Sequence, residues 1–186
     1  MGILTMLAMK KSPLLLLGLF VLVSCLPENN ENVIGVKFDG TGYKPIYASA
    51  DEIAKIEFTA AKPLTEPGKI YVSDPYLFIN EMGKGIHIIN NADPKNPENL
   101  SFISITGNYD MAAKDKWLYA DNLSNLLVFD ISDPKTPKLV KTIANAIPVN
   151  NYPPYQNIYF ECVESKKGLV IGWEKVTMSE KPRCYR

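Results

Sequence analysis

Histidine and cysteine are scarce in this sequence. Its 186 residues include one histidine, His87, and three cysteines, Cys25, Cys162 and Cys184, with no CxxC pair among them. A single histidine rules out a histidine-rich metal site and leaves no spare base for a conventional serine or cysteine triad. We therefore expect no metal and no cofactor, and interpret His87 as a core or near-surface side chain with one hydrogen-bond partner.

An excess of charge of either sign is also missing, because twenty lysines and arginines balance twenty aspartates and glutamates. Such a chain has no overall field that would attract nucleic acid, which we do not expect as a partner. Hydrophobic residues make up 46% of the chain and charged residues 22%, as is usual for a globular protein with one core. After residue 23 no apolar run approaches the length of a transmembrane helix.

The N-terminus reads as a secretory signal. Lys10 and Lys11 precede an apolar run over residues 13–23 that is too short to span a bilayer as a helix. The run ends in Leu-Val-Ser-Cys, with the cysteine at position 25, which resembles the lipobox of bacterial lipoproteins. The resemblance implies cleavage before Cys25 and diacylation of its sulfur. The alternative is an ordinary signal peptide followed by an incidental cysteine.

These features predict three parts: a signal peptide over 1–24, a polar, lipid-anchored tether over 25–41, and a folded domain over 42–186. Each buried methylene of an acyl chain contributes roughly 0.8 kcal/mol, so an anchor of two or three chains holds a protein at a membrane. Residue 26 is leucine and not aspartate, the residue that commonly retains enteric lipoproteins at the inner membrane. By resemblance we expect a location in the cell envelope, at the outer membrane.

The other two cysteines, Cys162 and Cys184, belong to a chain expected to leave the reducing cytosol, where thiols tend to pair. A bridge between them would stabilise the fold by about 3 kcal/mol in the chain-entropy model. Two unrelated free thiols are the alternative.

An internal repeat of forty residues is the most informative feature of the domain. Residues 77–97 align with 117–137 without a gap, and the segment ending DPKNP falls on the segment ending DPKTP. Both copies contain short runs rich in β-branched and aromatic residues, punctuated by Gly, Asn, Asp and Pro, which favours strands. In each turn the aspartate before the proline is expected to bond the backbone two residues further on. The eight predicted strands cover 69–73, 76–81, 85–90, 100–106, 109–113, 117–121, 126–131 and 138–143.

The repeated residues resemble the LVIVD-repeat family, in which an apolar strand precedes the pattern D-[IV]-S-D-P-x-x-P. Residues 127–137 match this pattern, whereas 87–90 depart from it. The resemblance, to lipoproteins of the Bacteroidetes type, implies a β-propeller. Four strands every forty residues is also the spacing of a propeller blade. The predicted fold is therefore all-β, a partial propeller of about two complete four-stranded blades plus partial flanking blades after the signal helix.

The partial blades are expected at residues 54–60, as a last strand before the first repeat, and at 159–164 and 169–175, as the first two strands of a third. Closed propellers need about four or more blades, so an open arrangement is expected. Its edges are either covered by the termini or pair with a second copy or another partner.

The candidate contact surface lies in the least repeat-like stretch, residues 149–160. Tyr152, Pro153, Pro154 and Tyr155 form an extended aromatic segment there that could stack on sugars or bind a protein. It could equally cover the edge of a blade.

Carboxylates that could do acid–base chemistry occur singly, and a turn or solvent-facing role accounts for each. They are Asp74, Glu81, Asp110, Asp115, Asp121 and Asp130. We therefore expect a non-catalytic binding or scaffold lipoprotein whose ligand is an envelope protein or glycan. A glycan-active hydrolase or lyase on a propeller-like fold is the alternative from another class. A shortened propeller relative without activity of its own is a third.

Overall fold

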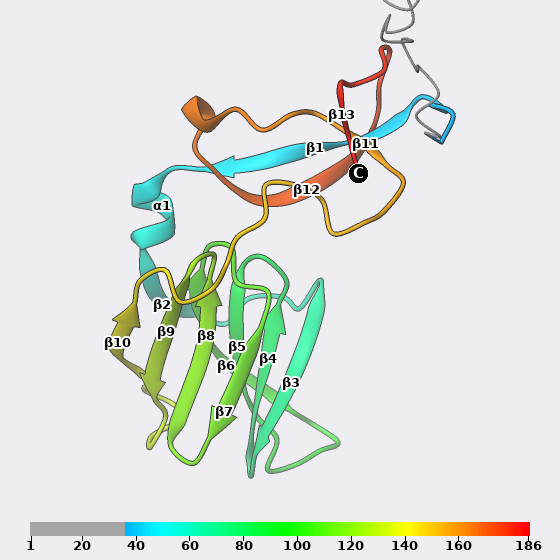
Figure 1. The fold of residues 1–186 in the computed structure, drawn as a ribbon. Helices are drawn as coiled ribbons and strands as arrows, with labels where there is room; N and C mark the ends of the chain where they lie inside the picture. Colours follow the sequence, from blue (N-terminus) through cyan, green and yellow to red (C-terminus); the bar gives the residue numbers. More distant parts are fainter. Residues whose placement is uncertain (1–35) are drawn as a thin grey trace, which may run out of the picture. The chain divides into compact units, whose positions relative to one another are not determined.

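The computed structural model describes residues 36–186, so the expected signal peptide and Cys25 lie outside the described residues. Within this range the chain is mostly β-strand, with a single short α-helix, and forms three open sheets (Figure 1). The all-β prediction is confirmed. The first two sheets follow the two repeats, and the third combines strands from both ends of the described chain.

The first sheet is an antiparallel meander of β3 to β6 with one additional strand. Its members are β2 (Ile56–Ala60), β3 (Pro67–Ser73), β4 (Tyr76–Glu81), β5 (Gly85–Asn90) and β6 (Glu98–Ile105), in the order β2-β6-β5-β4-β3.

The strand predicted over 54–60 is present as β2, but it differs from the prediction in where it starts and in the sheet it joins. Ala54 ends the helix α1 (Ala50–Ala54), which begins at a capping box formed by Ser49 and Glu52. The strand β2 then pairs with β6 as a fifth member of the first sheet.

The second sheet is a meander of four strands, β7 (Met111–Lys114), β8 (Trp117–Asn122), β9 (Asn125–Asp130) and β10 (Lys138–Ile143). Their order is β10-β9-β8-β7. The two proline turns form as the sequence predicts, because Asp93 Oδ1 accepts from Lys95 N at 3.0 Å and Asp133 Oδ1 accepts from Lys135 N at 3.1 Å. These side chains replace backbone partners in the turn between the third and fourth strands of each repeat.

The two repeats are not related by one constant offset. Asn90 and Asp130 end equivalent strands forty positions apart, but Asn90 pairs with Tyr76 whereas Asp130 pairs with Trp117. The β4–β5 turn holds three residues, 82–84, and the β8–β9 turn holds two, 123–124. The gap-free alignment is therefore one residue out of register for β4 and β8. Because successive side chains of a strand point to opposite faces, the gap-free alignment matches each β4 residue with a β8 residue on the other face of the repeat unit.

The main core lies between the first and second sheets. Phe78 and Ile88 of the first sheet pack in one cluster with Leu118 and Phe129 of the second, and all four are fully buried. In the corrected register the second-sheet equivalents of Phe78 and Ile88 are Tyr119 and Val128, which alternate with the buried residues and face away from the first sheet. Each sheet thus uses the opposite face of its repeat to build this core.

The third sheet has the order β12-β1-β11-β13. Its strands are β1 (Thr41–Ala48), β11 (Tyr159–Phe160), β12 (Leu169–Thr177) and β13 (Cys184–Tyr185), with the 3₁₀ turn η2 (Ser165–Lys167) before β12. The predicted pairing of 159–164 with 169–175 as a third repeat is wrong, because β1 lies between these segments, antiparallel to β12 and parallel to β11.

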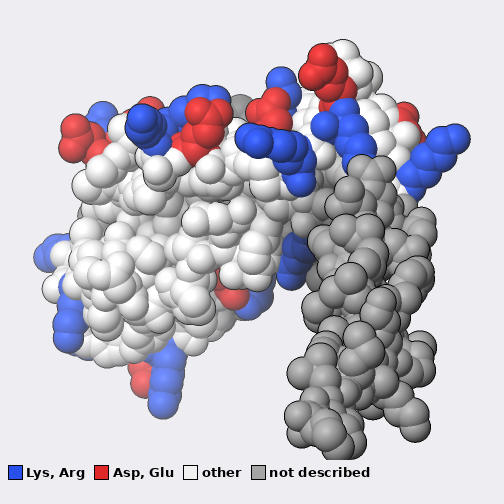
Figure 2. Space-filling view, turned by 45° about the horizontal axis from the view of Figure 1, so that its top comes forward, with Lys and Arg blue, Asp and Glu red and all other residues white. Residues whose placement is uncertain are grey.

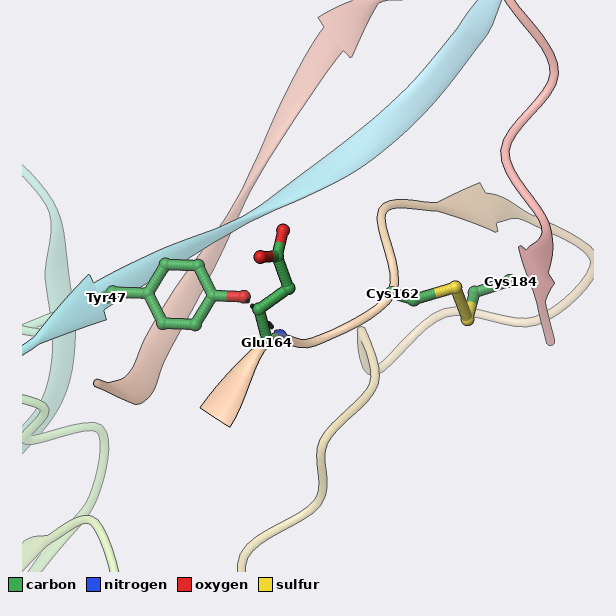
Figure 3. Close-up of a disulfide and its surroundings, with 4 residues drawn as sticks. All are labelled: Tyr47, Cys162, Glu164 and Cys184. Carbon is green, nitrogen blue, oxygen red and sulfur yellow. Dashed lines mark hydrogen bonds between the residues drawn. A yellow bond between two sulfur atoms is a disulfide. The ribbon is translucent and has the colours of Figure 1, made fainter. Parts of the chain in front are cut away.

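A disulfide joins Cys162, just after β11, to Cys184 in β13, with Cα atoms 5.3 Å apart (Figure 3). On the other side of the same loop, the backbone N–H of Glu164 donates to the Tyr47 hydroxyl of β1 at 2.8 Å. The chain after β11 is therefore held to both neighbouring strands of the sheet.

Among residues 36–186, no helix has the length and apolar character needed to cross a bilayer.

Phe129 tests the core between the two sheets. Its ring is fully buried and meets the Phe58 ring edge-on, with centroids 6.1 Å apart. Phe129→Ala should lower the free energy of unfolding by about 3–5 kcal/mol, because it leaves a cavity between two sheets. Urea denaturation followed by circular dichroism measures this change. Val140→Ala, on an exposed strand, is the matched control and should stay within about 0.5 kcal/mol of the unmodified chain; a similar loss in both variants would contradict this core.

Candidate binding groove

A groove of about 460 Å³ lies where the second sheet, residues 147–155 and strand β12 meet. Four aromatic side chains line it, together with one carboxylate and one guanidinium. These residues are Tyr109, Tyr152, Tyr155, Trp173, Asp121 and Arg186. Clefts with aromatic walls and a few polar groups are typical of ligand sites.

The contact residues expected from the sequence are mostly here. Tyr152, Pro154 and Tyr155 line the groove, whereas Pro153 is buried and does not. The Tyr155 ring is tilted against Tyr43 of β1, with centroids 5.0 Å apart, and remains half exposed. Its position is thus fixed by the third sheet while one part of it stays accessible.

Arg186 holds the segment from the other side. Its guanidinium lies 3.8 Å from the centroid of the Tyr152 ring and donates to the backbone oxygen of Pro153 at 2.8 Å. A cation over an aromatic ring and a charge-assisted hydrogen bond both order the side chains they join. The aromatic segment therefore approaches a ligand already partly organised, which lowers the entropic cost of binding.

Tyr109 and Trp173 are members of the groove that the sequence did not identify. Tyr109 follows the first repeat, and its hydroxyl donates to the Ile171 oxygen of β12 at 2.5 Å. Trp173 lies on β12, and its ring meets the Phe160 ring edge-on, with the two centroids 5.3 Å apart. Neither residue belongs to a motif, and only the pairing of β12 with β1 brings them beside the aromatic segment.

Buried amides form the hydrogen-bonded floor beneath this end of the two sheets. Asn80 Nδ2 donates to Asn108 Oδ1 at 2.5 Å, and Asn108 Nδ2 donates to Asp121 Oδ1 at 2.7 Å. The same Asp121 oxygen accepts the backbone N–H groups of Tyr109 at 2.7 Å and Asp110 at 2.9 Å. Asp121 therefore orders the connection between the two repeats and fixes the backbone of Tyr109, one of the aromatic residues of the groove.

Two groups of the groove have perturbed acidities. Burial raises the pKa of Asp121; the hydrogen bonds from Asp110, Tyr109 and Asn108 oppose this rise, and the neighbouring Asp110 charge adds to it. Burial also raises the pKa of the Tyr109 phenol, helped by the negative charges of Asp121 and Glu66. A carboxylate whose ionised form is disfavoured gains from a ligand that donates a hydrogen bond to it.

The other carboxylates singled out from the sequence have structural partners or lie in turns. Asp110 is next to Asp121, but its Oδ1 lies 2.6 Å from Lys69 Nζ. Asp130 accepts the backbone N–H of Ser132 at 2.9 Å, in the turn after β9. Asp74 and Asp115 lie in the turns before β4 and β8. In the part of the chain that the structure describes, no group of three or more potential ligand side chains is placed to hold a metal ion.

His87 and Glu81 form a second, fully buried cluster. His87 Nε2 donates to Glu81 Oε2 at 3.1 Å, and the His87 ring packs on Phe102 with centroids 4.7 Å apart. This histidine has one hydrogen-bond partner, as the sequence predicts.

Glu81 holds the segment over residues 61–66 across the outer face of the first sheet. Its Oε1 accepts the Glu66 N–H at 2.8 Å and the Thr65 hydroxyl, and its Oε2 accepts the Thr65 N–H at 3.1 Å. In the same segment Lys62 lies over the Phe102 ring at 4.6 Å. The segment thus covers Phe102 and His87, which explains why a histidine on an outer face is buried.

Charge on the surface is mixed in sign. In the view of Figure 2, acidic and basic side chains alternate along the upper margin, and a wide area below them carries few charges. The visible face therefore offers no large field of one sign to a ligand.

The Glu81 cluster should make stability depend on acid. Burial raises the pKa of Glu81, but the hydrogen bonds from Thr65, Glu66 and His87 lower it from 4.5 to about 2. The cluster therefore contributes its full stability above pH 4.5 and loses it as the pH falls towards 2. Urea denaturation at several pH values between 4.5 and 2 should show that the free energy of unfolding falls more steeply with decreasing pH for the unmodified chain than for Glu81→Gln.

Glu81→Gln should also be less stable near neutral pH, because an amide cannot accept all of these hydrogen bonds. Glu98→Gln changes an exposed carboxylate of the same sheet and should keep the original pH profile. If Glu81→Gln kept that profile too, Glu81 would not be the group that responds.

Comparison of the chain with protein-family models, with curated proteins and with solved structures gives no match.

Proposed function

We propose that this protein is a lipid-anchored binding module of the cell envelope that recognises its ligand in the aromatic groove without transforming it. The observation that carries the proposal is the convergence of Tyr109, Tyr152, Tyr155 and Trp173 on one accessible groove. Large aromatic side chains with polar neighbours are the groups that dominate recognition surfaces.

The ligand class is an envelope glycan or an extended protein segment. Both present flat or extended surfaces that stack on aromatic rings, and both supply hydroxyl or amide groups for Asp121 and Arg186. The charged residues lining the groove are one of each sign, Asp121 and Arg186, which suits a ligand of low net charge better than nucleic acid.

We infer that the first and second sheets are blades of a partial propeller related to the LVIVD-repeat family. Three features support this: each sheet contains a four-stranded meander spanning about one forty-residue repeat, the first strands β3 and β7 of these meanders lie near one another, and the two sheets meet through opposite faces of the repeat. Propeller blades pack in this way around an axis. The third sheet serves in this proposal as a closing element that completes the groove.

An enzyme acting on glycans is the second candidate, and the raised pKa of Asp121 favours it. Glycoside hydrolysis normally needs two carboxylates that flank the same bond. Among the described residues lining the groove, Asp121 is the one carboxylate, and its Oδ1 already accepts three hydrogen bonds. Binding without turnover is therefore the better-supported function.

Tyr155→Ala should weaken binding about tenfold, because it removes a half-exposed aromatic ring that lines the groove. The test immobilises the chain and measures retention of solubilised envelope proteins and of purified envelope polysaccharides. Leu169→Ala, an exposed apolar residue of β12 outside the groove, is the matched control and should bind like the unmodified chain.

Equal retention of ligand by Tyr155→Ala and Leu169→Ala would show that the groove is not the binding site. Release of cleaved sugar that disappears in Asp121→Asn would favour the enzyme. An unmodified chain that retains nothing would favour a shortened relative without activity of its own.

Cys25 carries the proposed anchor. Cells expressing the chain and fed labelled palmitate should incorporate label into it, and Cys25→Ser should abolish that label and release the protein from the membrane fraction. Cys162→Ser is the control, since it removes a cysteine but leaves the lipobox intact. Equal labelling of Cys25→Ser and the unmodified chain would contradict the anchor.

A further inference from the structure

The strand β12 forms an open edge of the third sheet, and part of that edge lines the aromatic groove. It is nine residues long, the longest strand of the described chain, and it stands first in the order β12-β1-β11-β13. Four consecutive residues of β12, 170–173, line the groove. Because successive side chains of a strand point to opposite faces, lining by consecutive residues means that the groove meets β12 along its edge.

The register with β1 gives the backbone groups of β12 that point to this open edge. Met178 N donates to Gly40 O at 2.8 Å, one position beyond the pair formed by Thr177. Hydrogen-bonded pairs alternate with open pairs in an antiparallel ladder, so Trp173, Lys175 and Thr177 are in open pairs with β1. These three residues therefore direct their N–H and C=O groups away from β1.

Two other contacts agree with this direction. Trp173 is opposite Pro45, which has no N–H to donate and therefore fits an open pair. The carbonyl oxygen of Ile171, two residues before Trp173, accepts the Tyr109 hydroxyl at 2.5 Å on the side away from β1. No strand of residues 36–186 pairs with this side of β12, so the outward groups from Trp173 to Thr177 have no sheet partner there.

A polypeptide backbone is the partner that such a row of groups fits. The outward donors and acceptors of β12 recur every second residue, about 7 Å apart, and an extended chain presents complementary groups at the same interval. A sugar chain has no alternating backbone donors and acceptors at this repeat. Long open edges are normally shortened, covered or charged in proteins, because they pair with other chains.

The face of the third sheet beside this edge selects the side chains of such a segment. Trp173 and Lys175 lie on the same face as Tyr43, on which the Tyr155 ring packs. The side chains of an added strand pair with those of β12 across the edge. An aromatic or large apolar side chain then lies opposite Trp173, in the groove, and an acidic side chain complements the exposed Lys175.

We propose that an extended polypeptide segment binds by adding a strand to the open edge of β12, with one end in the aromatic groove. The segment carries an aromatic or large apolar residue and, two positions away, an acidic residue. The hydrogen bond from Tyr109 to Ile171 ends the free row, so the added strand pairs with β12 from Trp173 to Thr177. Because binding in the groove is itself the proposed function, strand addition rests on it and specifies a protein segment, not a glycan, as the ligand.

A proline at an outward position tests the backbone pairing. Lys175→Pro removes one outward N–H but leaves the hydrogen bonds between β12 and β1 in place, because proline is tolerated on the open side of an edge strand. Lys175→Ala is the matched control, since it removes the same side chain and keeps the N–H. Thr177→Pro, compared with Thr177→Ala, repeats the test at the end of β12, and urea denaturation checks that each variant is folded.

The probe is a random library of short peptides displayed on phage and selected on the immobilised full-length chain. Selected sequences should share an aromatic or apolar residue two positions from an acidic one. A synthetic peptide of such a sequence, followed by fluorescence anisotropy, should bind Lys175→Pro about tenfold more weakly than Lys175→Ala, because a hydrogen bond is lost and the proline ring occupies its place. Methylation of single backbone nitrogens of the peptide should weaken binding at every second residue, because only alternate N–H groups of an added strand face β12.

Equal binding of that peptide to Lys175→Pro and Lys175→Ala, or methylation effects without a two-residue period, would overturn strand addition. If no peptide is selected while envelope polysaccharide is retained by the unmodified chain and lost by Tyr155→Ala, the groove is a glycan site and strand addition is again overturned. If neither peptide nor polysaccharide binds, the proposed function fails together with it.

Discussion

Burial of apolar side chains between the two repeat sheets is the interaction on which the rest of the structure depends. Phe78, Ile88, Leu118 and Phe129 are removed from water only because the two sheets pack together. The connection between those sheets, residues 106–110, is held in the same place by Asn108 and Asp121. Tyr109 extends from that connection and donates a hydrogen bond to Ile171 of β12. The packing of the two repeat sheets therefore also positions this side of the groove.

Buried polar groups in this protein mainly organise loops. Glu81 and His87 hold the segment over 61–66, while Asn80, Asn108 and Asp121 hold the connection that follows the first repeat. Such groups cost free energy unless every partner is present, so each of them ties a loop to one conformation. The acidic residues that might have suggested catalysis are therefore explained largely by the shape they give to the backbone.

Local sequence signals predicted the two repeat sheets well because short β-rich runs and Asp-Pro turns act over a few residues. The relative register was wrong by one residue, since a gap-free alignment cannot reveal that the β4–β5 turn is one residue longer than the β8–β9 turn. The strand β1 was missed, because its partners β11 and β12 lie more than a hundred residues away. The groove was found only in part for the same reason, since Tyr109 and Trp173 join Tyr155 through that distant pairing.

The position of β1 between β11 and β12 also has a consequence for the order in which the chain matures. A nascent polypeptide could assemble its two repeat sheets from neighbouring strands, but β1 can complete its pairing only after residues 159–177 have been made. Its unpaired backbone would meanwhile be accessible to chaperones and proteases. The oxidation of Cys162 and Cys184 then falls among the last events of biogenesis, after the two repeats have found one another.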